Sequence, residues 1–297
     1  MRFTVLSWNV FHGRDFPPDP ALFTWRSRLL GTSERGATHI QVNRELLDEF
    51  AQTLAAAEWD VALLQECPPR WWAPLAAACE AESHGVLTSR NSLGPLRAYF
   101  AAQNPDLLAA GEGGSNLTLV RNSFQCAFCS HGDQKAHRNG RERLERRELT
   151  IHEGAPERRA MAFTRVARPA GSDGARGAEL CVANLHATND RPRMATEDVL
   201  RAAEAATEWA GGAPLVFGGD LNLRPAEDPA AFERLDERFG LAAPTAPDAI
   251  DHILARGLET IEPPRAWPPQ ERELREDGLA LRLSDHAPVE ACFAIDG

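Results

Sequence analysis

Short apolar runs of strand length recur along the whole chain, separated by polar turns and a few segments of helical periodicity. Most runs are nearly continuous in apolar character, which is typical of strands covered on both faces. They span residues 3–10, 60–66, 117–121, 126–130, 160–166, 180–185, 214–220, 249–255 and 287–294. Because strands outnumber helices and their order is mixed, the pattern predicts an α/β fold with two packed β-sheets flanked by helices.

Helical patterns are fewer. Asn43 is a plausible N-cap for a helix that ends near Trp59, and Leu46, Phe50 and Leu54 fall on one face of it. Two further helices are predicted over residues 70–82 and 196–211. Inserted loops are predicted near residues 13–42, 131–157 and 258–283. We interpret residues 1–297 as one domain, because two-sheet folds reach this size.

The composition is that of an ordinary folded chain, with 43% hydrophobic and 25% charged residues, which excludes a mainly disordered or fibrous protein. The formal net charge is −11, whereas proteins that coat nucleic acid non-specifically are usually basic. An enzyme with a local basic groove is still compatible with this charge.

No apolar run approaches the ~20 residues that span a bilayer. The first residues have the pattern of a strand and not of an export signal. The six cysteines are dispersed along the chain, and without an export signal we interpret them as reduced, mostly buried thiols. These features predict a cytoplasmic protein with no membrane span.

Three local patterns each allow a structural and a functional interpretation. Residues 135–147 hold six basic and two acidic side chains, as in a solvated face or in an arm that follows a phosphate backbone. Cys126 and Cys129 have the spacing of half a zinc site, but a matching second pair is missing and the alternation fits a strand. Trp71 and Trp72 suit a stacking platform for bases or, more simply, a core anchor.

Polar residues stand at or next to the ends of the apolar runs again and again. They are Asn9, Glu66, Asn184, His186, Asp220, Asn222, Asp251, His252, Asp285 and His286. Catalytic groups gather at strand ends because the scaffold locks their positions. Since most of these side chains are hard oxygen donors, they predict a shared cleft that binds Mg²⁺ or Mn²⁺ rather than a zinc cage.

Six short motifs occur in this order: Ser-Trp-Asn9-Val, Leu-Gln-Glu66, Asn184-Leu-His186, Gly-Asp220-Leu-Asn222, Ile-Asp251-His-Ile and Ser284-Asp285-His286-Ala-Pro. Together they resemble the endonuclease/exonuclease/phosphatase superfamily. That family includes pancreatic-type deoxyribonucleases, exonuclease-III-like apurinic endonucleases, neutral sphingomyelinases and inositol-polyphosphate 5-phosphatases. The resemblance covers the chain from Ser7 to Phe293. It implies a four-layered α/β sandwich and metal-assisted hydrolysis of a phosphate ester.

The resemblance also implies which residues hold the metal and the phosphate. Glu66 would be the principal Mg²⁺ ligand, with Asn9 beside it and Asp285 helping, a pattern of few carboxylates that is normal for Mg²⁺. Two weaker matches, Arg159 in Glu-Arg-Arg159-Ala and Asn116 in Gly-Ser-Asn116-Leu, would contact the substrate phosphate.

Five residues would carry the chemistry, again as the resemblance implies. Asp220 would orient or deprotonate the attacking water, and Asn222 would donate hydrogen bonds to the phosphate or to Asp220. His286 would contact the phosphate as general base or as charge stabiliser, with Asp251 fixing its tautomer. His186 would donate to a non-bridging oxygen in the transition state.

Some positions depart from the family pattern or stay open. Phe11 stands where the apurinic endonucleases carry an acidic residue, which disfavours DNA repair specifically. His12 suits either a loop surface or the rim of the cleft. His252 is expected to be a packing or surface histidine, since the family position is commonly aromatic.

The sequence therefore predicts a Mg²⁺-dependent phosphoesterase, most simply a phosphodiesterase, that acts as a monomer. The alternatives are a soluble phosphomonoesterase, a phospholipid phosphodiesterase, or a non-catalytic binding module on the same fold. A nucleic-acid substrate predicts that the basic run borders the cleft. A lipid substrate predicts an exposed apolar rim.

Overall fold

Two mixed β-sheets form the centre of the molecule. The computed structural model describes residues 1–88, 94–129, 144–152, 159–167, 179–189, 191–242 and 245–295. In order across it, the first sheet contains β12 (Glu259–Ala266), β15 (Val289–Ala294), β1 (Arg2–Asn9), β4 (Val61–Gln65), β6 (Ser115–Arg121) and β5 (Ala81–Leu87). The second sheet contains β11 (Asp251–Arg256), β10 (Leu215–Asp220), β9 (Glu179–His186), β8 (Arg159–Ala167) and β7 (Leu144–His152).

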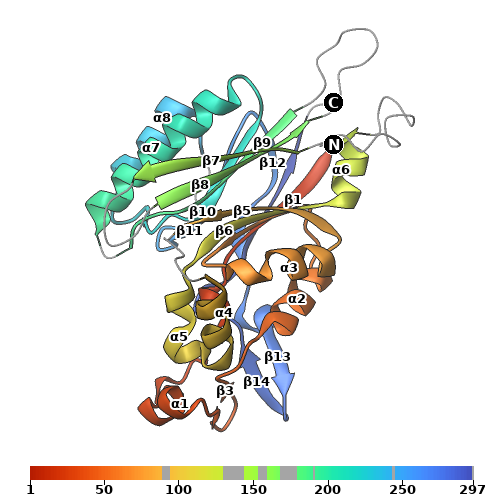
Figure 1. Ribbon diagram of the computed structural model, residues 1–297. Coiled ribbons are helices and arrows are strands. Elements are labelled where there is room, and N and C mark those ends of the chain that lie inside the picture. Colours follow the sequence, from red (N-terminus) through yellow and green to blue (C-terminus); the bar gives the residue numbers. More distant parts are fainter. Residues whose placement is uncertain are drawn as a thin grey trace.

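Helices cover the outer faces of both sheets, so the predicted four layers are confirmed (Figure 1). The first sheet is covered by α2 (Leu47–Ala56) and α3 (Trp72–Ala78), and the second by α7 (Pro192–Ala210) and α8 (Pro229–Phe239). The remaining helices are α1 (Trp25–Leu30), α4 (Gly94–Gln103), α5 (Pro105–Glu112) and α6 (Asn122–Cys129), with short 3₁₀ turns η1 (Phe11–Gly13), η2 (Pro20–Leu22), η3 (Pro69–Trp71) and η5 (Pro269–Arg272). None of the described helices is both long enough and apolar enough to cross a membrane.

The central strands bury both of their faces, as their continuous apolar runs predict. Along β4, Leu63 packs between the two sheets, whereas Leu64 packs under the helices of the first sheet. Along β9, Val182 lies between the sheets and Ala183 faces α7. This period of two places these central strands between two apolar cores.

Strand direction brings the polar strand ends together. β1 runs parallel to β4 in one sheet, and β9 runs parallel to β10 in the other. Parallel neighbours end at the same edge of a sheet, and the sheets pack face to face. The side-chain amide of Asn9 on β1 therefore reaches the carboxylate of Asp220 on β10, at 3.0 Å.

The predicted strand over residues 126–130 is wrong, because residues 122–129 form helix α6. Phe124 and Phe128 are four residues apart, and both are buried in the core between the sheets. That spacing puts both rings on one helical face, and it outweighs the strand preference of phenylalanine and cysteine.

The predicted N-cap at Asn43 is also wrong, since α2 begins at Leu47. The amide of Asn43 instead donates to the backbone oxygen of Ser27 (3.0 Å) and to the Oδ1 of Asn104 (2.8 Å). Asn43 therefore ties the segment before α2 to the chain around α1 and α4.

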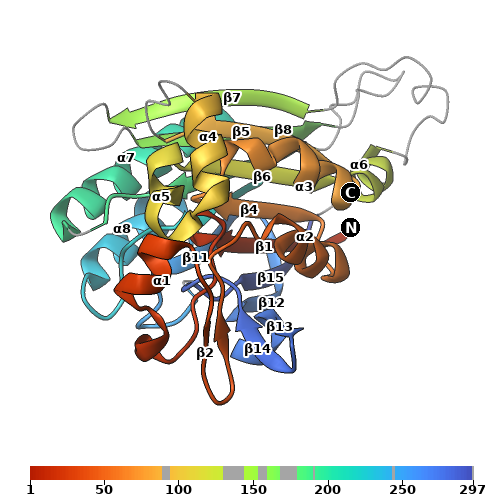
Figure 2. The same ribbon diagram turned by 60° about the horizontal axis from the view of Figure 1, so that its bottom comes forward.

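Two of the predicted inserted loops contain regular structure. Residues 13–42 hold α1 and the pair β2 (Glu34–Arg35) and β3 (Ile40–Gln41), and residues 258–283 hold β12 and the hairpin β13 (Glu273–Glu276) and β14 (Leu279–Arg282). Figure 2 shows both small pairs projecting at one end of the molecule. Of the third predicted loop, residues 144–152 form β7, and the other parts lie outside the described residues.

Candidate active site

Five of the predicted residues stand at the ends of central strands. Asn9 is the last residue of β1, Glu66 follows β4, and His186 and Asp220 end β9 and β10. Asp220 pairs across the sheet with His186 on one side and with Asp251, the first residue of β11, on the other. The register of these three strands thus places two acids and an imidazole side by side.

Short distances connect the groups into one cluster. The Nε2 of His186 lies 3.4 Å from the Oδ2 of Asp220 and 3.8 Å from the Oε1 of Glu66. The Nδ1 of His286 is hydrogen-bonded to the Oδ2 of Asp251 at 2.7 Å, and its Nε2 lies 3.9 Å from Asp220 and 3.9 Å from Asp285.

Hydrogen bonds hold Asn222 and His286 in place next to Asp220. The backbone N–H of Asn222 donates to the Oδ1 of Asp220 (3.1 Å), and its side-chain amide donates to the backbone oxygen of Ala187 (3.1 Å). Because the Nδ1 of His286 is hydrogen-bonded to the carboxylate of Asp251, the Nε2 of His286 is directed at Asp220. This is the arrangement in which a carboxylate fixes the tautomer and orientation of a histidine.

Burial and mutual repulsion shift the pKa values of the central pair. Burial raises the pKa of Asp220, and the nearby carboxylate of Asp251 raises it further. Burial lowers the pKa of His286, but the carboxylates of Asp251, Asp220 and Asp285 outweigh burial and raise it above its usual value. Without a metal, His286 is therefore the protonated member of the pair, and Asp220 takes up a proton more readily than an ordinary aspartate.

The pKa values of Glu66 and His186 move the other way. Burial raises the pKa of Glu66, but His12, His186 and His286 together with a hydrogen bond from Asn9 lower it below the usual value. Burial lowers the pKa of His186 to about 3. Glu66 is therefore an ionised carboxylate at neutral pH, and His186 is a neutral imidazole that can donate one N–H.

The backbone around the cluster is strained. Glu66, Asn222 and Ser284 have positive φ angles of 51°, 51° and 59°, as do Phe11 (50°) and His12 (53°). Non-glycine residues adopt this region infrequently, and such residues concentrate at functional sites, where the surrounding structure compensates for the strain. The strained residues fall at the ends of β1, β4 and β10 and just before His286.

His12 lies at the rim of the cleft, which answers the question left open by the sequence. Its Nε2 is 3.2 Å from the Oε2 of Glu66. His252, in contrast, is completely buried and contacts the backbone of Thr245, Leu223 and Ala249. The expectation that His252 packs and does not line the cleft is confirmed.

Asn116 and Arg159 lie next to the strands that carry the cluster. Asn116 is completely buried between the sheets, and its amide donates to the backbone oxygen of Ala160 at 2.8 Å. Arg159 is 3% exposed, and its charge lowers the pKa of His186. A contact of either side chain with substrate phosphate stays a prediction.

Two arginines near the cluster could not be found from motifs. Arg14 follows η1, and its charge interacts with Glu66 and Asp285, while its guanidinium carbon lies 3.6 Å from the centre of the Phe11 ring. Arg272 binds the turn that carries His286, donating to the backbone oxygens of Ser284 (2.8 Å) and His286 (2.5 Å). Each arginine stands in a segment predicted to be a loop, and the only sequence signal is its proximity to a motif.

The donor set fits a hard divalent cation. Glu66, Asp285 and the side-chain carbonyl of Asn9 are oxygen ligands of the kind that Mg²⁺ and Mn²⁺ prefer. A second grouping lies beside it, because ligand atoms of Asp220, Asp251 and His286 lie within 4.8 Å of one another. A metal at Glu66, Asp285 and Asn9 stays a prediction, since the Oδ1 of Asn9 accepts from the backbone N–H of Phe11 at 3.0 Å. The grouping of Asp220, Asp251 and His286 offers an acidic and imidazole group for catalysis or for an ion.

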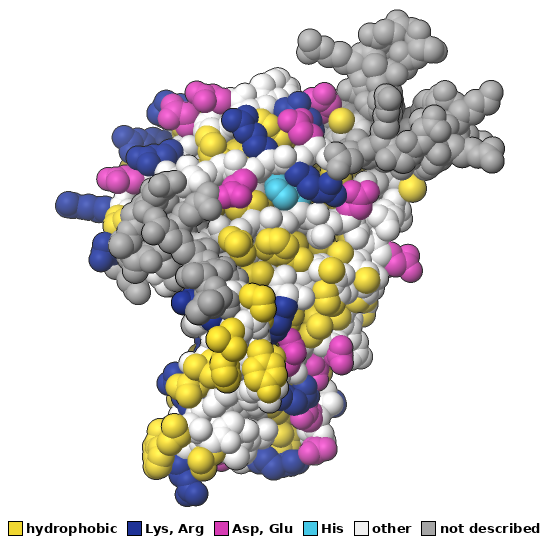
Figure 3. Space-filling view, in the orientation of Figure 1, with side chains coloured by type: hydrophobic (Ala, Val, Ile, Leu, Met, Phe, Trp, Pro, Cys, Tyr) yellow, Lys and Arg dark blue, Asp and Glu magenta, His cyan; other side chains and the backbone are white. Residues whose placement is uncertain are grey.

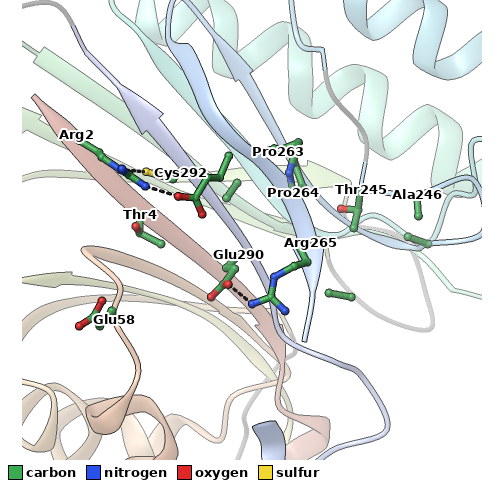
Figure 4. Close-up of a pocket in the computed structure, with 14 residues that line it drawn as sticks. Arg2, Thr4, Glu58, Thr245, Ala246, Pro263, Pro264, Arg265, Glu290 and Cys292 are labelled. Carbon is green, nitrogen blue, oxygen red and sulfur yellow. Dashed lines mark hydrogen bonds and ion pairs between the residues drawn. The ribbon is translucent and has the colours of Figure 1, made fainter. Parts of the chain in front are cut away.

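Two hollows lie near these elements. One of about 510 Å³ includes Asn222 and is lined by three arginines (Arg191, Arg193, Arg224) and two acids (Glu227, Asp228). Arg224 pairs with Glu227 at 3.8 Å. The other hollow, of about 690 Å³, lies along β1, β12 and β15 (Figure 4).

The hollow in Figure 4 is not a site for phosphate. Arg2 is bound to Glu262, and Arg265 is bound to Glu290 at 2.5 Å. Its two arginines are thus neutralised by carboxylates, and an anion would compete with both pairs.

The remaining predicted features fall outside the cleft or outside the described residues. Trp71 is buried in the core, as the simpler interpretation holds, and the indole of Trp72 donates to Ser115. Of the basic run, residues 135–143 lie outside the described residues, and Arg146 is paired with Glu82 at 2.7 Å. Cys126 lies on α6, and the side chain of Cys129 is outside the described part of the chain.

Comparison with known proteins gives one family match. The profile of the Endonuclease/Exonuclease/phosphatase family matches residues 6–286. A sequence search among curated proteins finds no match.

Solved structures share the fold at low sequence identity. An endonuclease/exonuclease/phosphatase family protein from Bacteroides thetaiotaomicron has a TM-score of 0.62 at 14% identity, covering 100% of this chain and 96% of its own. The mannosyl-6-phosphatase of the same organism has a TM-score of 0.60 at 15% identity, covering 99% and 100%. The human Nocturnin catalytic domain with bound sulfate has a TM-score of 0.55 at 11% identity, covering 99% and 95%.

Proposed function

Because this chain belongs to the endonuclease/exonuclease/phosphatase family, whose members are hydrolases of phosphoesters, we propose that it is a Mg²⁺-dependent phosphodiesterase. The observation that carries the proposal is the convergence of Asn9, Glu66, Asp220 and His286 at one edge of the two sheets. These side chains come from four separate strands and turns, so their meeting is a property of the fold.

Glu66, Asn9 and Asp285 would hold the ion. When bound, Mg²⁺ supplies charge neutralisation at a phosphate oxygen and at the leaving group. The ionised state of Glu66 is maintained without it, because His12 and His286 lower the pKa of Glu66 despite its burial. Mn²⁺ fits the same oxygen donors.

Asp220 is the general base in this proposal. Its raised pKa suits a group that accepts the proton of the attacking water near neutral pH. The backbone N–H of Asn222 and the side-chain amide of Asn9 both donate to its carboxylate and hold it in position. The water oxygen forms a bond to phosphorus as the P–O bond to the leaving group breaks.

His286 stabilises charge and does not remove the proton. Its raised pKa keeps it protonated, so its Nε2 donates toward the reacting phosphate while Nδ1 stays on Asp251. His186, neutral and 3.4 Å from Asp220, donates to a non-bridging oxygen. Arg159 and Asn116 are the proposed supports on the side of β8 and β6.

The charges of the cleft balance before an ion binds. Four carboxylates (Glu66, Asp220, Asp251, Asp285) face three arginines (Arg14, Arg159, Arg272) and a protonated His286. A divalent ion would leave two positive charges, which attract an anionic phosphoester of either kind. The proposal of a diester therefore rests on the sequence resemblance, and the comparison of two substrates below tests it.

The compartment and the oligomeric state are proposed from the sequence alone. We propose that the protein acts in the cytoplasm as a monomer. A soluble phosphomonoesterase is the second candidate, because Arg191 and Arg193 line the hollow next to Asn222 and could receive a further anionic group of such a substrate. A nucleic-acid substrate remains a proposal that depends on residues 135–143.

The first test compares hydrolysis of bis-p-nitrophenyl phosphate and p-nitrophenyl phosphate with Mg²⁺, with Mn²⁺ and with EDTA. We expect metal-dependent turnover that favours the diester. Glu66→Gln and Asp220→Asn should each lower kcat by roughly 100-fold or more, since each removes a charge that acts on the reacting groups. Glu58→Gln changes an exposed acid and should leave the rate unchanged.

Preference for the monoester would overturn the diester assignment and favour the second candidate. Normal rates in Glu66→Gln and Asp220→Asn would overturn the proposed site. Circular dichroism of each variant ensures that a lost rate is not a lost fold.

A further inference from the structure

One surface of the molecule is apolar although it is exposed. Among the residues that the structure describes, the exposed large hydrophobic side chains other than Met1, Phe16 and Ile261 lie on three helices: Trp25, Leu29 and Leu30 on α1, Leu96, Tyr99 and Phe100 on α4, and Leu107 and Leu108 on α5. We call these eight residues the α1/α4/α5 face. Trp25 is 73% exposed and Tyr99 is 61% exposed. Scattered apolar side chains are ordinary, but a cluster of this kind marks an interaction surface.

The three helices form one surface. Asn104 joins α4 to α5, and its amide donates to the backbone oxygen of Arg28 on α1 at 2.7 Å. Asn43 donates to Asn104 from the other side (2.8 Å). Figures 1 and 2 both place α1 next to α5, and Figure 3 shows yellow side chains gathered over this part of the molecule.

The charges on these helices have one sign. The exposed charged residues of α1 and α4 are Arg26, Arg28 and Arg97. The two carboxylates of α5 are buried: Asp106 accepts from Gln41, and Glu112 pairs with Arg70. The α1/α4/α5 face is thus cationic on a chain whose net charge is −11.

This combination fits the surface of an anionic bilayer. Tryptophan and tyrosine favour the boundary between headgroups and acyl chains, and exposed leucines insert below it. Arginines beside them are attracted to anionic headgroups. A second copy of the chain fits less well, because a symmetric contact would bring two sets of three arginines together.

The face is next to the candidate active site. Gly114 follows α5, and a Cβ atom there would lie 3.3 Å from the Cα of Glu66 and 3.4 Å from the Cε1 of His12. Aromatic rings also run from the cleft toward α1, with Phe11 to Phe16 at 5.8 Å and Phe16 to Phe23 at 5.1 Å. Phe23 stands two residues before the first residue of α1.

We propose that the α1/α4/α5 face docks the protein on anionic phospholipid membranes. Docking orients the strand-end cleft toward the headgroup layer, where phospholipids carry phosphodiesters. The docking itself is independent of the proposed reaction, whereas the choice of a phospholipid as substrate rests on it.

Co-sedimentation with vesicles of phosphatidylcholine, with and without phosphatidylserine, tests the docking in the full chain. We expect binding to the phosphatidylserine vesicles that weakens with salt. Trp25→Gln should weaken it by about tenfold through lost apolar burial, and Arg26→Gln or Arg28→Gln by about fivefold each. Ile261→Gln and Arg275→Gln change exposed residues of β12 and β13 and should leave binding unchanged.

Three results would overturn the docking proposal. The first is no association of the wild-type chain with either vesicle, and the second is equal weakening by Ile261→Gln and Trp25→Gln. The third is a wild-type dimer in light scattering that Trp25→Gln converts to a monomer, because the face would then bind a second copy.

Hydrolysis of soluble bis-p-nitrophenyl phosphate separates this proposal from the proposed function. Trp25→Gln should keep the wild-type rate, which also shows that the variant folds. If the wild-type chain binds vesicles but hydrolyses no diester, the docking proposal is supported and the proposed function is contradicted.

Discussion

At the scale of single residues, the candidate active site contains charges and backbone angles that usually lower the stability of a folded protein. Two carboxylates pair directly across β10 and β11, and Glu66, Asn222 and Ser284 hold positive φ angles. A residue held at such a φ angle costs on the order of 1–3 kcal/mol, and the conformation persists only where the surroundings impose it. The surroundings here are specific: the Ser284 hydroxyl donates to the backbone oxygen of Asn9 at 2.6 Å and accepts from the N–H of His286.

The raised pKa of His286 gives a testable prediction at the scale of single residues. Asp251→Asn removes the hydrogen-bonded carboxylate that most raises the pKa of His286. In metal-free protein we expect that pKa to fall, measured by NMR titration of the labelled imidazole. Asp248→Asn changes an exposed acid and should leave it in place. An unchanged pKa in Asp251→Asn would contradict the geometry.

The same residue makes stability depend on pH with a defined sign. A histidine whose pKa is raised in the folded state stabilises fully below its unfolded pKa of about 6.5 and loses this contribution as pH rises through the folded pKa. The difference in free energy of unfolding between wild type and His286→Gln, without metal, should therefore shrink from pH 6 toward alkaline pH. Urea denaturation at each pH measures it.

Individual site residues were predictable where a strand end made them conspicuous. Asn9, Glu66 and Asp220 each close an apolar run, so their position at a sheet edge follows from the pattern. Arg14 and Arg272 follow from no such pattern, because their contacts are made by segments that return to the cleft from elsewhere in the chain.

At the scale of elements, β10 carries the closest packing beside the site. Gly219 has a φ of +133°, and a Cβ atom there would lie 1.9 Å from the backbone oxygen of Leu185 on β9. Neither Gly219 nor Leu185 can move aside, because the close contact lies between the backbones of two paired strands. We expect Gly219→Ala to cost roughly 3 kcal/mol or more and to displace Asp220.

Denaturant unfolding and the hydrolysis assay measure the two effects of Gly219→Ala. Gly212→Ala is the matched control, since a Cβ at Gly212 meets nothing within 4 Å, and it should be near neutral in both. A fully active Gly219→Ala variant of normal stability would show that β9 and β10 are not packed as described.

Helices and strands were predictable from the sequence where their apolar side chains are buried in a core. The strands from residues 3, 60, 180 and 214 onward follow from their continuous runs, and α7 follows from its spacing. Helices α4 and α5 were not predicted, because residues such as Leu96 and Leu107 are exposed and break the usual relation between an apolar face and a core. β12 was missed because its side chains are mostly exposed and it contains two prolines, which are tolerated at the edge of a sheet.

At the scale of the whole molecule, the two sheets lock one acidic cleft in place. The Gln65 amide donates to the Oδ1 of Asn184 at 2.9 Å across the gap between the sheets. The amide of Asn184 in turn donates to the backbone oxygen of Leu117 at 3.1 Å. This buried polar contact holds β4 and β9 at one relative position, so the carboxylates above it cannot move apart to relieve their repulsion.

A divalent ion should therefore stabilise the entire fold. An ion that binds only the folded chain, at a hundred times its dissociation constant, adds about 2.7 kcal/mol, which corresponds to a rise in Tm of about 5 °C for a domain of this size. Differential scanning fluorimetry with Mg²⁺, Mn²⁺ and EDTA measures the shift. Glu66→Gln should reduce it strongly while folding normally, because the ion loses its principal charged ligand. Glu58→Gln should retain the full shift, and an equal loss in both variants would mean that the ion binds outside the cleft.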